Sequence, residues 1–167
     1  ESDVVVSTRV RLARNLAGLP FPHRIMGTER VREVKEPVKE CFLKNGMDFS
    51  LTEMKNLSPL ERTRLVEQHL ISRDLAKSPD GAVLLSPDQT VGIMMMEEDH
   101  YRLQCIKSGF QVDAALKGCQ ELERMLGEKA HYAFDEELGY LTACPTNLGT
   151  GLRIGVMMHL KGLAVTG

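Results

Sequence analysis

The chain has 167 residues, of which 43% are hydrophobic and 26% are charged, and its formal net charge is -2. This length fits one domain with a real core, the composition argues against disorder, and a charge so near balance gives no overall basic field for nucleic acid. The longest apolar runs are far shorter than the roughly 20 residues that a membrane helix needs, so we expect a cytoplasmic protein that binds neither nucleic acid nor a membrane.

No internal repeat or linker divides the sequence, so we expect a single domain over residues 1–167. The chain begins without methionine and ends just after a strand-like run, and we therefore expect this domain to be incomplete at its C-terminus. The four cysteines show neither a Cys-x-x-Cys pair nor the spacing of a zinc site, and they are expected to be thiols without a metal.

The first predicted element is a strand over residues 3–12, because its polar and apolar side chains alternate. Valines at even positions, together with Leu12, would lie on one face. Ser7, Arg9 and Arg11 would form a cationic row on the other face. Two guanidinium groups about 7 Å apart along a strand can bind one anion, such as a polyphosphate. A solvated strand face is the alternative interpretation.

The next elements are predicted from apolar spacing and helix-start signals. Residues 29–44 follow a helical period, although Pro37 is expected to kink or interrupt that helix. Residues 49–57 alternate as a second strand. The sequence Ser-Pro-Leu-Glu then begins a helix over residues 58–70, since a serine N-cap, a proline at the first position and a glutamate at the third are typical of a capping box.

The pattern of the second half of the chain predicts hairpins, strands and one strongly amphipathic helix. The predicted elements are a hairpin of residues 81–85 and 90–99, a strand over 101–109, a helix over 112–126, a short hairpin of 130–134 and 139–145, and a strand over 152–160. Hairpins with interspersed helices indicate an α+β fold with a largely antiparallel β-sheet flanked by helices. We expect the helices to cover one side of the sheet.

Two further stretches carry residues that can do chemistry. If the strand alternation continues through EEDHYR, residues 97–102, then Glu98, His100 and Arg102 share one face and form a site; a charged strand exit is the alternative. In CPTNLGTGLR, residues 144–153, a thiol, a Gly-rich turn and an arginine lie within ten positions. The glycines permit backbone conformations in which amide groups approach an anion. Cys144 could instead be a small buried residue.

Four segments together resemble a known family. CPTNLGTG is similar to the cysteine signature of the ATP:guanido phosphotransferases, also called phosphagen kinases, STRVRLARN to their first arginine motif, EEDHYRLQ to their acidic motif and LVEQHLIS to a segment with an ATP-contacting histidine. The resemblance covers nearly the whole chain in the right order, and it is closest to the bacterial branch, the protein-arginine kinases. It implies the catalytic-domain fold of that family.

The resemblance also implies a role for individual residues. Glu98 is expected to be the catalytic carboxylate, and Cys144 is expected to lie beside the guanidino group and to act on it electrostatically rather than as a nucleophile. The expected nucleotide-binding residues are Ser7, Arg9, Arg11, His69, Arg102 and Arg153. This chain departs from the family at Met96, where an asparagine is usual, and it lacks a C-terminal stretch with a further arginine and a second substrate carboxylate.

These roles imply transfer of the γ-phosphoryl group of ATP to arginine residues in proteins, with Mg²⁺ as a cofactor. No metal site made only of protein ligands is expected. No Walker loop and no HRD or DFG motif is present, which disfavours P-loop enzymes and Ser/Thr kinases. A small-guanidine kinase and a non-catalytic nucleotide-binding or adaptor module remain alternatives. The resemblance further implies a stress-response role, a Clp-type protease system as a partner, and a possible oligomer.

Overall fold

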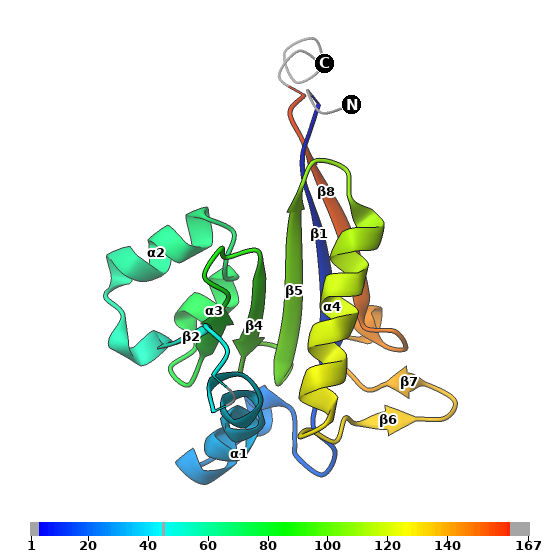
Figure 1. The fold of residues 1–167 in the computed structure, drawn as a ribbon. Coiled ribbons are helices and arrows are strands. Elements are labelled where there is room, and N and C mark those ends of the chain that lie inside the picture. Colours follow the sequence, from blue (N-terminus) through cyan, green and yellow to red (C-terminus); the bar gives the residue numbers. More distant parts are fainter. Residues whose placement is uncertain (1–3, 45, 161–167) are drawn as a thin grey trace.

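A computed structural model describes residues 4–44 and 46–160. Within these ranges six strands form one antiparallel sheet in the order β2-β3-β4-β5-β1-β8 (Figure 1), and β6 pairs with β7 in a separate hairpin. The strands are β1 (Val5–Arg14), β2 (Ser50–Glu53), β3 (Ala82–Leu85), β4 (Val91–Met95), β5 (Tyr101–Ser108), β6 (Phe134–Asp135), β7 (Gly139–Tyr140) and β8 (Leu152–Met158). The predicted α+β fold with a largely antiparallel sheet is confirmed.

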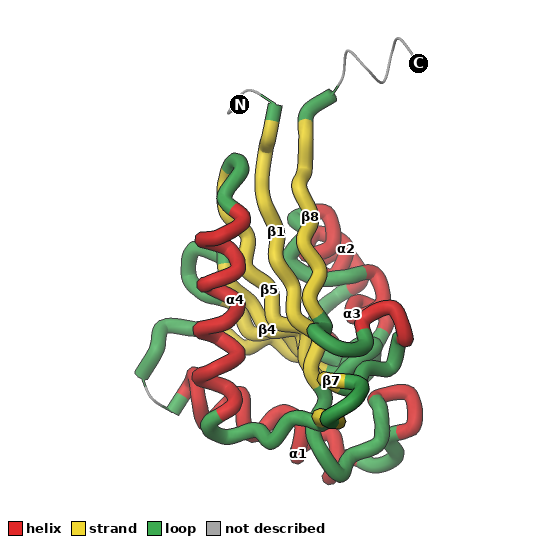
Figure 2. The backbone as a smooth tube through the Cα atoms, turned by 90° about the vertical axis from the view of Figure 1, so that its right-hand side faces the viewer, coloured by secondary structure: helices red, strands yellow, loops and turns green. Residues whose placement is uncertain are grey.

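Helices lie on both faces of this sheet, so the expectation that they cover one side is wrong. Helix α4 (Val112–Gly127) runs along β1 and β5 on one face, whereas α2 (Pro59–Glu67) and α3 (Arg73–Lys77) lie on the other, as the side view in Figure 2 shows. No helix in the described part of the chain is long and apolar enough to cross a membrane.

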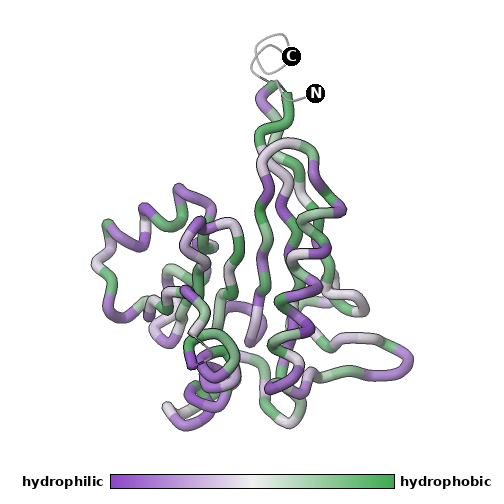
Figure 3. The backbone as a smooth tube through the Cα atoms, in the orientation of Figure 1, coloured by the Kyte–Doolittle hydropathy of each residue, from purple (hydrophilic) through white to green (hydrophobic). Residues whose placement is uncertain are grey.

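The core explains this arrangement. Alternate side chains of the central strands face α4, whose own buried residues recur at helical spacing (Ala115, Cys119, Leu122 and Leu126), and hydrophobic and hydrophilic stretches alternate along this helix in Figure 3. Helix α1 (Thr28–Val38) joins the same core. A second, smaller cluster packs α3 and the residues before it against β3 and β4 on the opposite face. That face is thus left open over β5, β1 and β8.

Pro37 was expected to kink or interrupt the first helix, and the interruption does not occur. Pro37 lies inside α1, and the chain continues directly into a π-helix over Lys39–Leu43, in which Lys44 N–H donates to the carbonyl of Lys39. Proline cannot donate the usual i→i−4 bond, and the wider turns that follow it are one way to continue a helix. Val34 and Val38 are fully buried, so core packing holds this segment helical.

Several predicted elements are shorter than expected, among them the hairpin of residues 130–134 and 139–145, which is reduced to β6 and β7, and the last strand, which ends at Met158. The second strand ends at Glu53 and passes into a 3-10 turn over Met54–Asn56; 3-10 turns also occupy Pro22–Arg24 and Pro145–Asn147. The next helix has the predicted capping box, since the Ser58 side chain accepts from Glu61 N–H, but it ends at Glu67. The strand expected over residues 90–99 ends at Met95, because the chain turns there.

Candidate active site

The open face of the sheet carries arginines on three neighbouring strands. In the register of β1, Arg11 lies opposite Gln104 of β5 on one side and opposite Arg153 of β8 on the other. Arg9 is two residues before Arg11 and Arg102 is two residues before Gln104, so all four arginines share this face. We call Arg9, Arg11, Arg102 and Arg153 the arginine face. The predicted cationic row is therefore part of a larger group.

The arginines of this face repel one another. Burial, and then the charges of Arg9, Arg102 and Arg153, lower the pKa of Arg11 to about 10. Burial and the charges of Arg102 and Arg153 likewise lower the pKa of Arg9. Arg11 Nε is buried and has no hydrogen-bond partner among the described residues. Arg11 is still charged at neutral pH, so a bound polyanion would relieve the repulsion.

Two hollows adjoin along the arginine face. The larger has a volume of about 500 Å³ and mostly apolar walls, formed by Val6, Ser7, Arg9, Gln68, His69, Ile106, Gly155, Val156 and Met157. The smaller is lined by Arg11, Ala13, Arg102, Asn147, Gly151 and Arg153. Ser7 and His69 therefore line the same hollow as Arg9. His69 lies beyond the end of α2 in the left-handed backbone region, at φ 59°, and its carbonyl accepts from Gln104 Nε2 over 3.3 Å.

The acidic motif forms a tight turn rather than a strand. Between β4 and β5, Met96 N–H donates to the carbonyl of His100 and Glu97 N–H donates to that of Asp99. We call residues 96–100 the acidic turn. The prediction that Glu98, His100 and Arg102 share one face of a strand is wrong, because the chain reverses there. Glu98 is exposed and accepts from Arg102 over 3.3 Å, whereas His100 is fully buried.

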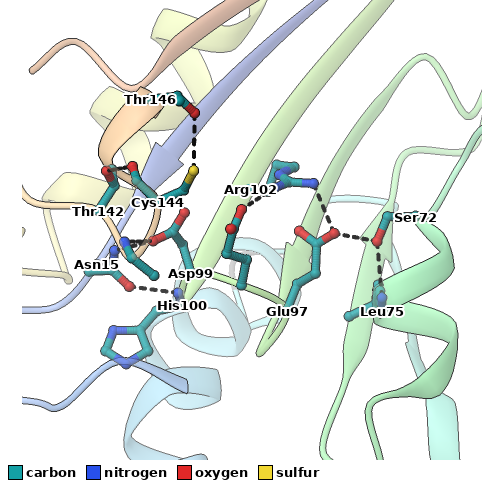
Figure 4. A network of polar contacts seen from close by, with 12 residues as sticks. Asn15, Ser72, Leu75, Glu97, Asp99, His100, Arg102, Thr142, Cys144 and Thr146 are labelled. Atoms are coloured by element: carbon teal, nitrogen blue, oxygen red, sulfur yellow. Dashed lines mark hydrogen bonds and ion pairs between the residues drawn. The ribbon is translucent and has the colours of Figure 1, made fainter. Parts of the chain in front are cut away.

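Glu97 also belongs to this site, although sequence alternation had assigned it to the opposite face. Its carboxylate accepts from Arg102 Nη1 over 2.8 Å and from the hydroxyl of Ser72, at the start of α3 (Figure 4). Burial raises the pKa of Glu97, and the charge of Arg102 and the Ser72 hydrogen bond oppose this. Its second oxygen, Oε2, is buried without a partner among the described residues. On a turn, both glutamates can reach the same arginine.

Met96 stands where the family resemblance leads us to expect an asparagine, and the structure shows its backbone and side-chain environment. Its backbone is in the left-handed region, at φ 61°, which asparagine adopts more readily than methionine. Its side chain is 4% exposed and belongs to the main core. Met94 and Met95 are buried as well, so the methionine run serves sheet packing.

The cysteine signature forms a loop that packs against the end of β1. Cys144 is half-buried, its Sγ lies 3.0 Å from Thr146 Oγ1, and its carbonyl accepts from Thr142 Oγ1. At Gly151 the backbone has φ 61° and a Cβ would lie 2.6 Å from the carbonyl oxygen of Ala13, so only glycine fits there. The other cysteines, Cys41, Cys105 and Cys119, are buried.

His100 holds the acidic turn to the chain beyond β1. Its Nδ1 accepts from Leu16 N–H over 2.9 Å, so in the neutral ring Nε2 carries the proton and donates to the carbonyl of Pro20 over 2.9 Å. Burial lowers the pKa of His100, and the contacts with Pro20 and Asp99 oppose this only in part. The histidine is therefore a neutral support of the turn.

A pH-dependent stability follows from this burial. An unfolded histidine has a pKa of about 6.5, so below that pH the unfolded state binds more protons than the native state and the free energy of unfolding falls. His100→Asn keeps an acceptor for Leu16 N–H but cannot titrate, and we expect a weaker decrease in stability between about pH 7.5 and pH 5.5. Urea unfolding at the two pH values measures this. The exposed control His131→Asn should behave like the wild type, and an undiminished decrease in His100→Asn would contradict the assignment.

The comparisons with known proteins agree with this geometry. Residues 31–167 match the profile of the ATP:guanido phosphotransferase C-terminal catalytic domain. The chain belongs to the ATP:guanido phosphotransferase family. It is similar to the protein-arginine kinases of Bacillus mycoides strain KBAB4 (45% identity over 170 residues) and Bacillus cereus strain AH187 (44%); each alignment covers 99% of this chain and 48% of the relative. This ATP:guanido phosphotransferase chain thus spans about half the length of the curated relatives that it matches.

Solved structures of guanidino kinases share the fold of this ATP:guanido phosphotransferase chain. It superposes on the duplicated taurocyamine kinase of Schistosoma mansoni with bound transition-state analogue components at a TM-score of 0.86 and 23% identity, over 99% of this chain and 25% of that one. A lombricine kinase matches at a TM-score of 0.83 and 25% identity, over 99% of this chain and 50% of that one. The predicted catalytic-domain fold is therefore confirmed.

Proposed function

We propose that this chain transfers the γ-phosphoryl group of ATP to a guanidino nitrogen, and that its natural acceptors are arginine residues of proteins. The observation that carries the proposal is the position of Arg102 between the arginine face and the two glutamates of the acidic turn. This arginine belongs to the arginine face, which suits a polyphosphate, and it also contacts Glu97 and Glu98. One residue thereby links the side that would bind phosphates to the carboxylates that would handle the acceptor.

Phosphoryl transfer needs mainly positioning and charge neutralisation, because its transition state is loose and its charge is spread over the phosphoryl oxygens. The arginine face supplies the neutralising charges without a Walker loop. In our proposal, the larger hollow with Ser7 and His69 receives the nucleoside, and the smaller hollow with Arg11 and Arg153 receives the phosphates. Fixed guanidinium groups are suited to this since they bind phosphate in a bidentate manner.

The residues at this site also fit a magnesium ion bound together with ATP. Mg²⁺ is usually held by one or two carboxylates, phosphate oxygens and water, and no cluster of three or more potential metal ligands occurs in the described residues. Glu97, whose buried Oε2 lacks a partner among the described residues, is the carboxylate that would hold it, which leaves the exposed Glu98 for the acceptor. When bound, the ion would neutralise charge on the phosphates.

The acceptor explains the need for a carboxylate. A guanidinium is protonated at neutral pH, with a pKa above about 12, and its nitrogen lone pair is delocalised, so it is a poor nucleophile. In the proposed mechanism Glu98 orients the guanidinium through paired hydrogen bonds and takes its proton as the nitrogen attacks phosphorus. Cys144 lies beside the acceptor and acts electrostatically, because direct transfer needs no enzyme nucleophile.

Protein arginine is preferred as the acceptor because the similar Bacillus proteins are named protein-arginine kinases. The fold is shared with kinases of small guanidines, so free arginine and related compounds are the second candidate. A role in stress response and a Clp-type protease partner are part of the proposal through family resemblance alone, and a cytoplasmic location is proposed with them.

The direct test uses labelled ATP with the full-length gene product. We expect acid-labile phosphate on a protein substrate and little on free arginine. Labelling of free arginine alone would favour the small-guanidine kinase. Nucleotide binding without transfer to either acceptor would favour the non-catalytic module and overturn the proposal.

Alkylation of Cys144 gives a second test of the site. We expect iodoacetamide to modify Cys144 several-fold more slowly when ATP and an arginine acceptor are both bound, because the acceptor would cover the half-buried thiol. Mass spectrometry of the peptide that contains Cys144 measures the rate. Buried Cys119 is an internal control that should stay unmodified in the native protein. A Cys144 rate that ligands do not change would place this residue outside the acceptor site.

A further inference from the structure

A buried polar pair joins the acidic turn to the end of strand β1. Asn15 directly follows β1 and Asp99 belongs to the acidic turn, and the two residues are 2% and 1% exposed. The Asn15 side-chain amide donates from Nδ2 to Asp99 Oδ1 over 2.7 Å. The residues lie 84 positions apart in the sequence, so this contact exists only in the folded protein.

The same two side chains hold the loop that leads to the cysteine. Asp99 Oδ1 also accepts from the backbone N–H of Ala143 over 2.8 Å, and Ala143 directly precedes Cys144. Asn15 Oδ1 accepts from the backbone N–H of His100 over 2.8 Å. Figure 4 shows Asn15 and Asp99 between the chain that carries Cys144 and the turn that carries His100. Glu98 directly precedes Asp99, so the pair adjoins both residues that are proposed to contact the acceptor.

Packing alone does not account for an amide and a carboxylate at this position. A buried carboxylate loses its hydration, and apolar residues of similar volume often stabilise a core equally well or better. Here Asp99 Oδ2 is buried and has no partner among the residues that the structure describes. Asn15 Nδ2 additionally donates to the carbonyl of Leu141 over 3.0 Å. These directional bonds fix the relative position of three chain segments: the residues after β1, the acidic turn and the loop that leads to Cys144. Apolar contacts would not fix it in this way.

We propose that Asn15 and Asp99 form a positioning pair, which sets the acidic turn and the cysteine loop in one geometry and thereby fixes the acceptor guanidinium relative to Glu98. This inference rests on the proposed function of Glu98 and Cys144. Neither Asn15 nor Asp99 touches the reacting atoms in this scheme. They act through the residues next to them in the chain.

The pair is expected to affect turnover more than nucleotide binding. In-line attack requires the acceptor nitrogen close to phosphorus, and a misplacement of about 1 Å can cost about 100-fold in rate. The arginine face is formed by side chains of β1, β5 and β8, and none of its guanidinium groups has a hydrogen bond to Asn15 or Asp99 in the described part of the chain. ATP should therefore bind normally when the pair is disturbed.

The test exchanges the donor and the acceptor of the pair in the full-length protein. Asn15→Asp places two carboxylates against each other, and we expect kcat to fall about 10- to 100-fold, the KM for ATP to stay within about two-fold, and Cys144 to be alkylated several-fold faster. In the double variant Asn15→Asp with Asp99→Asn, an amide again faces a carboxylate, and we expect most of the lost kcat and the slow alkylation to return. Asn56→Asp adds the same charge at an exposed position and should change nothing.

The outcomes separate a positioning role from a purely structural one. The proposal is overturned if Asn15→Asp leaves kcat and alkylation unchanged, or if kcat falls only in proportion to the folded fraction measured by circular dichroism. If Asn15→Asp does not fold, Asp99→Asn is measured instead, because asparagine keeps an acceptor for the side-chain N–H of Asn15 and the backbone N–H of Ala143. A several-fold loss of kcat with an unchanged KM for ATP supports the pair. Wild-type kinetics overturn it. If the wild type transfers no phosphate, the proposed function fails, and the alkylation rates alone decide on the pair.

Discussion

Replacing Glu98 with glutamine is expected to leave ATP binding intact and to lower phosphoryl transfer by about 100- to 10,000-fold. Glutamine has the size of glutamate and can still accept a hydrogen bond from Arg102, but it cannot take the proton of the acceptor guanidinium. Glu97 is poorly placed to substitute, because its carboxylate is buried and already bound by Arg102 and Ser72. The loss should therefore appear in kcat.

Single-turnover transfer from labelled ATP measures this effect, and the ATP-dependent rise in melting temperature measures binding. Glu121→Gln is the matched control, because Glu121 is an exposed carboxylate on α4, on the other side of the sheet, where it pairs with Arg124. It should retain wild-type transfer. Near-normal transfer in Glu98→Gln would remove Glu98 from the mechanism, and a parallel loss of ATP binding would indicate a structural effect instead.

The parts of this molecule that sequence alone could predict are those encoded by local periodicity. Two-residue alternation placed Arg9 and Arg11 on one face of β1, and helical spacing gave α4 with its buried Cys119 and Leu122. The capping box at Ser58 was also predicted, because all its groups lie within four residues. In each case the residues that make the contact are close together in the chain.

The parts that were missed depend on contacts between distant residues. Continued alternation through residues 97–102 failed, since His100 bonds to Leu16 and Asp99 to Asn15, and these tertiary contacts override the strand pattern. Glu97 was overlooked for the same reason. A signal was present, because a run of two glutamates, an aspartate and a histidine interrupts an apolar strand and is typical of a turn or a site. Its geometry could not be derived without knowing that Asn15 and Leu16, just after β1, are its partners.

Replacing Arg11 with glutamine is expected to have opposite effects on binding and on stability. Arg11 lies in the middle of the arginine face, between Gln104 and Arg153 in the strand register. Loss of its guanidinium should lower kcat/KM for ATP by about 100- to 1,000-fold, because one preorganised donor at the phosphates is removed. The nucleotide-free protein, however, should melt at a higher temperature, since one of four mutually repelling and partly buried charges is gone.

This opposition distinguishes a binding site from an incidental cluster of charges. If the arginine face exists to bind a polyanion, its repulsion in the free protein is offset when ATP binds, and saturating ATP should raise the melting temperature of the wild type much more than that of Arg11→Gln. Arg124→Gln is the matched control, because Arg124 is exposed on α4 and is surrounded by Glu121 and Glu128. It should leave the response to ATP unchanged and should not raise stability. Equal ATP responses in wild type and Arg11→Gln would mean that the phosphates bind elsewhere.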